Sequence, residues 1–461
     1  MSPTLLFVAI LILSASAYYL GVRRAFSVVG GPKGIRNLHS LPSYYGWLSA
    51  LWVAIPTLML FGFWLMFEST IITQMVVAGL PPELRELPSD RMTLVINDIR
   101  NLVAGNITSD KSPQLEAAAR HYEDLMATSH LALAVVALAV AAAGAAGVWL
   151  RIRPNLRARN QVERVLKVVM IVCSVIAILT TVGIIASVLF ESIRFFHLVP
   201  ITEFLFGLEW NPQIAIRADQ VAGSGAFGAI PVFAGTVLIS AIAMLVAVPI
   251  GLMSAIYLSE YASKRVRSAA KPLMEILAGI PTVVYGFFAA LVVAPSVRDL
   301  GASVGLSVSS ESALAAGVVM GIMIIPFVSS LSDDVINAVP QSLRDGAYAL
   351  GATQSEAVKH VVIPAALPGI VGGVLLAVSR AIGETMIVVM AAGLAANLTA
   401  NPFATVTTVT VQIVTLLTGD QEFDNPKTLA AFALGLILFI VTLLLNVIAL
   451  YMVRKYREQY E

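Results

Sequence analysis

The class of fold is decided by an apolar run near the C-terminus, Thr428 to Val453, which reads TLAAFALGLILFIVTLLLNVIALYMV. A helix of about 20 apolar residues spans a hydrocarbon layer of about 30 Å. The run has this length and contains no Asp, Glu, Lys or Arg, so it predicts a membrane-spanning helix. The whole chain agrees, because 58% of its 461 residues are hydrophobic and only 12% are charged. Soluble domains have about 45–50% apolar and about 25% charged residues.

Similar apolar runs recur from end to end of the chain and predict an all-α membrane protein, a polytopic helical bundle with about nine transmembrane helices. The nine expected spans lie at residues 4–22, 46–67, 130–150, 166–190, 232–259, 273–297, 312–332, 366–396 and 428–453. The first span is interpreted as an uncleaved anchor, because no Lys or Arg precedes it and Arg23-Arg24 follow it. Cleavage after the small residues Ala15-Ser16-Ala17 is the alternative.

Basic residues between the spans predict the orientation of the chain. When nine spans alternate, five segments on one side hold 19 of the 29 Lys and Arg residues, and these segments are 23–45, 151–167, 260–272, 333–365 and 454–461. Lys and Arg are enriched in cytoplasmic loops. We therefore expect the N-terminus outside and the C-terminus in the cytoplasm.

A basic hinge near residue 155 divides the sequence into two regions. Residues 1–155 form an N-terminal extension with three spans and an external loop at about 68–129, and residues 156–461 form a six-span core. Residues 94–100 and 114–126 of the loop read as amphipathic helices at the membrane surface. Solvated packing is the expectation for this loop, and a docking surface is the alternative.

Motifs for catalysis, nucleotide binding and metal binding are missing from the sequence. There is no Gly-x4-Gly-Lys-Ser/Thr phosphate loop, no His-Glu-x2-His and no Gly-x-Ser-x-Gly. The only cysteine, Cys173, lies in an apolar run, and the histidines are scattered, so neither a disulfide nor a metal site is expected. A chain that uses ATP without a phosphate loop must take the ATPase from a partner.

The most informative loop runs from Pro340 to Pro364. It contains PQSLRDGAYALGAT at 340–353, and VVIP at 361–364 follows Gly351 after nine intervening residues. Its pattern is similar to the EAA loop of ATP-binding cassette (ABC) importer permeases, Glu-Ala-Ala-x3-Gly-x9-Ile-x-Leu-Pro. Asp345 and Gly346 replace the usual Glu and Ala, while Ala347, Gly351 and Pro364 match. Gly351 permits a tight helix end and Pro364 is expected to stop the following helix. An ordinary connecting loop is the alternative, although this loop is long for that purpose.

From about residue 165 onward the sequence resembles the PstC-type permease subunit of bacterial phosphate importers. The motifs that carry the resemblance, in order, are EWNP at 209–212, FGAIP at 227–231, GT at 235–236, PIG at 249–251, YLSEY at 257–261 and EILAGIPTVVYG at 275–286. Each motif is weak alone, but their order and spacing are specific. The three-span extension has no counterpart in this resemblance.

The segment Ser379-Arg380-Ala381-Ile382-Gly383-Glu384-Thr385 resembles the Arg-Ala-x-Gly-Glu-Thr motif of phosphate permeases. Arg380 and Glu384 are four residues apart within an expected span, so a continuous helix would place them on one face, where they can pair. Gly383 would allow close approach of a helix or the substrate. Charges at this depth are costly unless they face a partner or a wet cavity. Ser379, Arg380, Gly383, Glu384 and Thr385 are therefore predicted to line the substrate pathway, and a structural ion pair is the alternative.

The resemblance implies a non-enzymatic type I importer permease that forms half of a heterodimeric pore for inorganic phosphate in the bacterial inner (plasma) membrane. It implies a homologous second permease, two ATP-binding subunits and a periplasmic phosphate-binding protein as partners. It implies no cofactor on this chain, since ATP and Mg would be bound by the ATPase, which Asp345, Gly346, Ala347, Gly351 and Pro364 would contact. The alternatives are an importer for molybdate or sulfate and a signalling or scaffold protein on an importer-like fold.

Overall fold

A computed structural model describes residues 3–85, 88–104, 112–214, 224–418 and 425–457. The chain divides into two compact units, Met1–Leu179 and Thr180–Glu461. The division falls inside one long helix, and each unit has hydrophobic clusters of its own. The boundary predicted near residue 155 stays a prediction.

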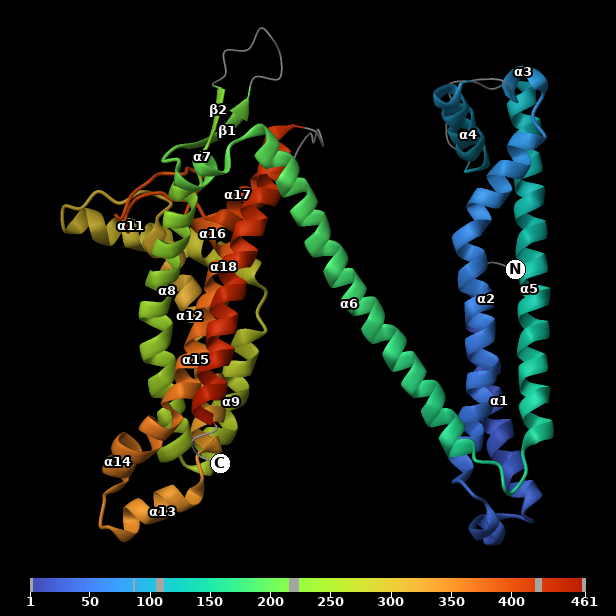
Figure 1. The fold of residues 1–461 in the computed structure, drawn as a ribbon, viewed down its shortest axis with the longest axis horizontal. Helices are drawn as coiled ribbons and strands as arrows, with labels where there is room; N and C mark the ends of the chain where they lie inside the picture. Colours follow the sequence, from blue (N-terminus) through green and yellow to red (C-terminus); the bar gives the residue numbers. More distant parts are fainter. Residues whose placement is uncertain (1–2, 86–87, 105–111, 215–223, 419–424, 458–461) are drawn as a thin grey trace. The chain divides into compact units, whose positions relative to one another are not determined.

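The first unit is a bundle of long helices with short helices at their ends (Figure 1). Its elements are α1 (Pro3–Val28), the 3₁₀ helix η1 (Pro32–Asn37), α2 (Pro42–Ala78), α3 (Pro82–Arg85), α4 (Ser89–Val103), α5 (Pro113–Arg151) and the first part of α6 (Ala158–Leu198). Helix α2 packs along both α1 and α5. The expected amphipathic helix at 94–100 is part of α4, but residues 114–126 are the first turns of α5 instead of a separate helix. Residues 86–87 and 105–111 of the expected loop lie outside the described residues.

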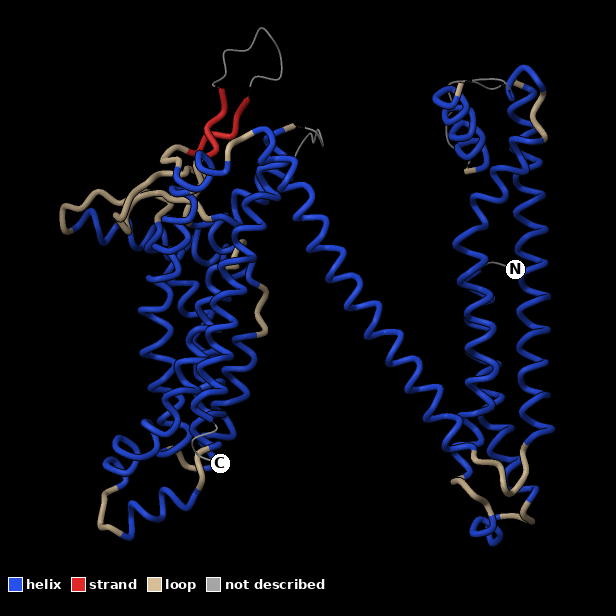
Figure 2. Tube along the Cα trace, in the orientation of Figure 1, coloured by secondary structure: helices blue, strands red, loops and turns tan. Residues whose placement is uncertain are grey.

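The second unit is a helical bundle capped by a two-stranded antiparallel sheet at one end (Figures 1 and 2). After the remainder of α6 come α7 (Ile201–Phe206), β1 (Trp210–Ile214), β2 (Ser224–Phe227), α8 (Ile230–Ile256), the π turn η2 (Tyr257–Tyr261), α9 (Lys264–Ala278), α10 (Thr282–Phe288), the π turn η3 (Ala289–Val293), α11 (Ala294–Ser303), α12 (Ala313–Ala338), α13 (Gln341–Ala349), α14 (Gln354–Ala357), the π turn η4 (Val358–Val362), α15 (Ile363–Ile382), α16 (Met386–Ala391), α17 (Val409–Leu417) and α18 (Pro426–Arg457). Helices α13 and α14 lie at the end of the unit opposite the sheet (Figure 1).

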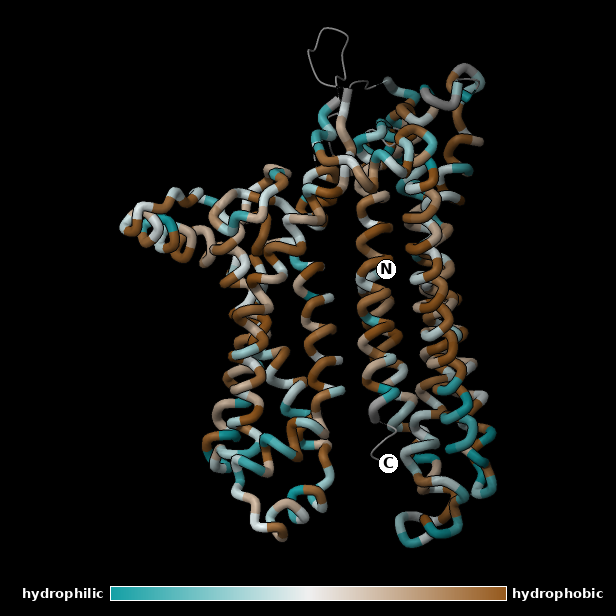
Figure 3. The backbone as a smooth tube through the Cα atoms, turned by 60° about the vertical axis from the view of Figure 1, so that its left-hand side comes forward, coloured by the Kyte–Doolittle hydropathy of each residue, from teal (hydrophilic) through white to brown (hydrophobic). Residues whose placement is uncertain are grey.

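Within the described ranges, nine helices are long and apolar enough to cross a membrane, which confirms the expected number. In both units hydrophobic residues fill the middle of the long helices and hydrophilic residues gather towards their ends (Figure 3). Two boundaries differ from expectation. The sixth span begins at Thr282, because Pro281 separates it from α9. The eighth runs from Gln354 to Ile382, so residues 383–396 lie outside it.

The core of the second unit is built around α12, which packs against α8, α15 and α10. Small residues bring α8 and α12 together. A Cβ atom added to Gly317 would lie 2.6 Å from Cγ2 of Ile242, and one added to Gly321 would lie 2.9 Å from the carbonyl oxygen of Ala243. Without a hydrophobic force between helices in lipid, such close packing contributes much of the stability. The segment from Val406 to Gln412 is buried in this unit.

Gly144 of α5 packs directly against the backbone of α2 in the first unit, because a Cβ atom there would overlap the carbonyl oxygen of Trp52. Gly147 in the same helix has nothing within 4 Å of its Cβ position. We expect Gly144→Ala to lower the free energy of unfolding by about 1–3 kcal/mol, the usual cost of overpacking. Gly147→Ala should leave it unchanged or raise it by up to about 1 kcal/mol, because Ala favours helix.

Thermal unfolding of the two purified variants in detergent measures this difference. Equal melting temperatures for Gly144→Ala and the unmodified protein would show that α2 and α5 are not held at this distance.

Candidate functional site

The predicted substrate motif lies where a membrane helix breaks. Helix α15 ends at Ile382, and α16 begins at Met386. The carboxylate of Glu384 accepts hydrogen bonds from the backbone N–H groups of Met386, at 3.1 Å, and Ile387, at 3.5 Å. Glu384 therefore caps the first turn of α16, where a negative charge is favourable.

The expectation of a shared helix face for Arg380 and Glu384 is wrong, because the helix stops between them at Gly383. No ion pair joins these two residues in the part of the chain that the structure describes. The hydroxyl of Thr385 donates to the carbonyl of Gly383, and the carbonyl of Ser379 accepts from the N–H of Gly383. The five predicted pathway residues thus form one helix end and the turn after it.

Arg380 projects from the last turn of α15 and is exposed in the isolated chain. Its Cζ atom lies 5.5 Å from the centre of the Phe327 ring. Its guanidinium makes no hydrogen bond or ion pair to another residue within the described ranges. A guanidinium that stacks on an aromatic ring and keeps its N–H donors free is suited to receive an anion.

Arg380 lines a cavity of about 240 Å³ between α9, α12 and α15. The wall also contains two cations from α9, Arg267 and Lys271, and two carboxylates, Glu275 and Asp333. Apolar residues and two serines complete it: Leu258, Met274, Ala278, Met323, Pro326, Phe327, Ser329 and Ser330. The charged side chains of the wall sum to one net positive charge.

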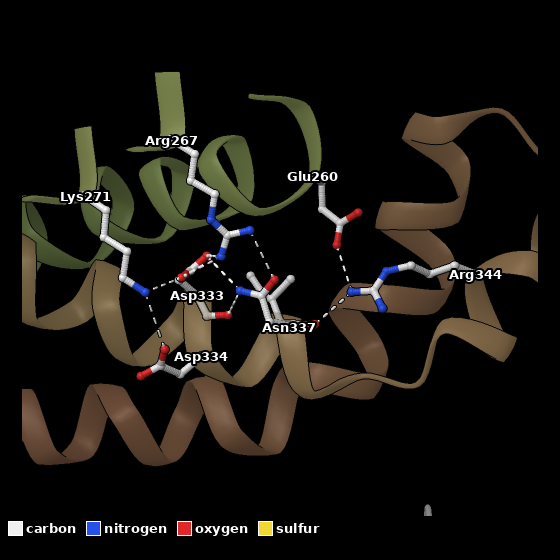
Figure 4. Close-up of polar contacts among 8 residues, drawn as sticks. Glu260, Arg267, Lys271, Asp333, Asp334, Asn337 and Arg344 are labelled. Atoms are coloured by element: carbon white, nitrogen blue, oxygen red, sulfur yellow. Dashed lines mark hydrogen bonds and ion pairs between the residues drawn. The ribbon is translucent and has the colours of Figure 1, made fainter. Parts of the chain in front are cut away.

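Asp333 of α12 is the most buried charge in this wall, with 6% of its side chain exposed. Figure 4 shows Arg267 and Lys271 reaching from α9 towards it. Nη2 of Arg267 lies 3.0 and 3.1 Å from its two oxygens, and Nζ of Lys271 lies 3.0 Å from Oδ2. Asn337 donates to Oδ1 at 2.9 Å. A carboxylate this buried needs such partners, so the cluster fixes α9 against α12.

The predicted coupling loop contains a short helix, α13, that ends at a glycine. Gly351 has a φ of +84°, the conformation that favours glycine. The N–H of Gly351 donates to the carbonyl of Tyr348, and that of Ala352 donates to the carbonyl of Ala347. These two bonds make a Schellman motif, so the tight helix end expected at Gly351 is present.

Arg344 attaches α13 to the bundle. This residue is buried, and its guanidinium donates to the carbonyls of Val339, at 2.6 Å, and Ile336, at 2.8 Å, and to Oε1 of Glu260, at 3.0 Å. Glu260 belongs to η2 at the end of α8 (Figure 4). Removal of either partner would leave a buried charge unpaired, which is strongly destabilising.

The other predicted coupling residues lie on both sides of α13. Asp345 and Gly346 are exposed, and Asp345 accepts a hydrogen bond from Gln341, whereas Ala347 is buried. Pro364 does not stop a helix, contrary to expectation, because η4 lies directly before α15 and the helix continues from Gln354 to Ile382. Proline has no backbone N–H to donate, and the wider π turn before it accommodates this missing hydrogen bond. Leu343, Tyr348 and Leu350 are also exposed, Leu350 to 90%.

Sequence reasoning missed the residues that fix this site. Glu260, Arg267, Lys271, Asp333 and Arg344 were not singled out, although Glu260 lies in a motif of the resemblance and Arg344 precedes Asp345. In the first unit it also missed a buried cluster. Glu68 accepts a hydrogen bond from Ser129, and its Oε1 lies 3.3 Å from Nε2 of His130. Charged side chains in or beside spans were a signal for both clusters.

Comparisons with known proteins bear on both parts of the chain. Residues 7–180 match a family described as "Phosphate ATP-binding cassette transporter", and residues 247–458 match "Binding-protein-dependent transport system inner membrane component". The phosphate transport system permease protein PstC of Mesorhizobium japonicum is 35% identical over 267 residues, covering 55% of this chain and 78% of that protein. The chain belongs to the PstC-type permease family.

Two further relatives of this PstC-type permease agree. PstC 1 of Mycobacterium tuberculosis is 35% identical over 277 residues, covering 55% of this chain and 81% of the relative. The probable ABC transporter permease protein YqgH of Bacillus subtilis is 31% identical over 250 residues, covering 54% and 77%. The expected family and fold class are therefore confirmed, and the extension, which lacked a counterpart in the core resemblance, has a family match of its own.

Membership in the family settles the coarse role of the PstC-type chain. It is a multi-pass membrane component of an ABC importer, and its partners are other components of such an importer. Its relatives are transport permeases.

Proposed function

We propose that this chain is the permease subunit that forms half of the pathway for inorganic phosphate in an ATP-driven importer of the inner membrane. The observation that carries the proposal is the unpaired guanidinium of Arg380 in the wall of a cavity beside a broken membrane helix. The PstC relatives are named phosphate transport permeases, which supports phosphate as the substrate. Molybdate and sulfate are the competing oxyanions.

Arg380 is the residue that meets the ion. A guanidinium can donate two parallel hydrogen bonds to a phosphate, and it stays charged in any environment. Glu384 acts on this residue indirectly, because its cap on α16 stabilises the break at which α15 ends. Ser379, Gly383 and Thr385 shape the same turn. Glu384 is thus proposed to act through the helix break, and no longer through the direct ion pair with Arg380 that the sequence suggested.

The loop around α13 couples the permease to ATP hydrolysis on separate subunits, which also hold ATP and Mg. Exposed side chains, including Leu343, Asp345 and Leu350, form the contact surface, and the bonds of Arg344 transmit its movement to α12 and α8. Two ATP-binding subunits, a homologous second permease and a periplasmic phosphate-binding protein complete the complex. The N-terminus lies outside the cell and the C-terminus in the cytoplasm.

The pathway is tested by Arg380→Gln, which keeps hydrogen-bonding groups and removes the charge. We expect phosphate uptake by the reconstituted importer to fall by roughly a hundredfold, since a charge-assisted pair is worth about 3 kcal/mol. Arg380→Lys should retain part of the uptake, because it keeps the charge without the planar fork. Arg265→Gln, an exposed α9 residue outside the cavity wall, is the control. Normal uptake by Arg380→Gln would disprove the role, and failure of that variant to assemble would indicate a structural one.

The coupling role is tested by Gly351→Val. A β-branched residue at positive φ costs about 1–2 kcal/mol, so the end of α13 should distort and ATPase-driven uptake should fall while the chain still inserts. Gly305→Val is a matched control, because Gly305 ends α11 with φ +76°, the same pair of backbone bonds and open surroundings. Full uptake and normal co-purification of the ATPase with Gly351→Val would contradict the proposal.

The orientation is tested by single cysteines in a Cys173→Ala background. Ser307 and Ser342 are both exposed and lie on opposite sides in the proposed topology. In intact cells, a membrane-impermeant thiol reagent should label Ser307→Cys from outside and should reach Ser342→Cys only after the membrane is opened. Outside labelling at Ser342→Cys would reverse the orientation.

A further inference from the structure

Ser329 has a buried hydroxyl that no part of the described chain satisfies. The residue is 0% exposed, its Oγ has no hydrogen-bond partner, and it lines the cavity that contains Arg380. Buried hydroxyls on other helices donate to the carbonyl four residues earlier, as Thr57 of α2 does to Val53 and Thr236 of α8 does to Val232. Buried polar groups nearly always have partners, so an unpaired hydroxyl in a cavity wall is suited to bind a molecule that enters the cavity.

The two cations of α9 line the same cavity, and each has N–H donors that do not bind Asp333. Arg267 binds Asp333 through Nη2 alone, and its Nη1 is 3.4 Å from the Oδ1 of Asn337. Lys271 binds Asp333 at 3.0 Å and lies 3.8 Å from Asp334, which is 66% exposed and outside the wall. An ammonium group has three donors, so Lys271 keeps at least one free. Glu275 is an exposed carboxylate of the wall, and water can solvate it.

We propose that this cavity is a binding site for a tetrahedral oxyanion, with Arg380 at one pole, Lys271 and Arg267 at the other, and the Ser329 hydroxyl donating a hydrogen bond between them. The cavity of about 240 Å³ is many times larger than the roughly 10–15 Å³ that one water molecule needs, so a phosphate ion fits. The proposal rests on the phosphate function given above and adds three residues from two further helices to the pathway.

The two poles differ in strength, and the difference suits transport. The carboxylate of Asp333 pairs with Arg267 and Lys271 and so offsets much of their positive potential. Arg380 has no carboxylate partner in the described chain. An anion is therefore attracted by Arg380 and held only weakly by the α9 pole. A site of this kind binds phosphate and still releases it, which a fully cationic pocket would not do at low dielectric.

The occupancy of the cavity can be measured by protection of a thiol. Ala278 is a small, exposed residue of the wall, so Ala278→Cys in the Cys173→Ala background provides the reporter. In the purified importer complex, inorganic phosphate should slow its reaction with a thiol reagent. Adding Ser329→Ala should raise the phosphate concentration for half-protection by about tenfold, the typical effect of losing one hydrogen bond to a charged group. Lys271→Gln should also raise it, while Arg267 and Asn337 still bind Asp333.

Ser259→Ala is the matched control, because Ser259 also has a buried hydroxyl without a partner but does not line the cavity. It should leave half-protection unchanged, and neither serine variant should lower the melting temperature, since each removes an unsatisfied group. Absence of protection, an Ala278→Cys thiol that never reacts, or an unchanged value in Ser329→Ala would each overturn the proposal. If uptake still depends on Arg380, only this cavity site is then wrong, whereas a complex that takes up no phosphate contradicts the proposed function itself.

Discussion

Lipid offers no hydrogen-bond partners, so every backbone group that a broken membrane helix releases must be satisfied by the protein itself. The break at Gly383 meets this constraint locally. The carboxylate of Glu384 accepts from the first N–H groups of α16, and the hydroxyl of Thr410 donates to the carbonyl of Glu384 at 2.8 Å. The carboxylate of Glu384 therefore faces the N–H groups of α16, and within the described residues it forms no ion pair with Arg380. The free cation in the cavity is thus a consequence of how the helix break is stabilised.

The need to satisfy buried polar groups within the protein also explains the distribution of charge around α12. Asp333 is buried and binds two cations, and Glu260, whose side chain is 9% exposed, binds Arg344, so both carboxylates are compensated. Replacing such pairs by apolar residues often costs no stability, so their presence indicates a need to fix specific elements together. Here they fix α9 and α13 to the bundle. Arg380 differs, because within the described residues its guanidinium contacts the ring of Phe327 and no carboxylate.

The sequence predicted what depends on local pattern and missed what depends on long-range pairing. Nine apolar runs and the glycine end of α13 follow from composition and spacing, and the structure has both. The break after Ile382 was missed because Arg380 and Glu384 have the spacing of helix neighbours, and only the packing of Thr410 and the cap on α16 favour a turn. Pro364 was misinterpreted because a preceding π turn tolerates it. Asp333 lies 66 residues from Arg267, so no local pattern connects them.

Helix α12 connects the loop at one end of the unit with the cavity. Arg344 binds the carbonyl of Ile336, Asp333 lies three residues earlier, and Ser329 lies four residues before that. This spacing places Ile336, Asp333 and Ser329 on one face of α12. Phe327 and Pro326 continue into the cavity wall, where Phe327 contacts Arg380. A movement of α13 would therefore act on α12 through Arg344, and any shift of α12 against α9 would change how strongly Asp333 holds Lys271 and Arg267. The strength of the weak anion pole is in this way linked to the position of the loop.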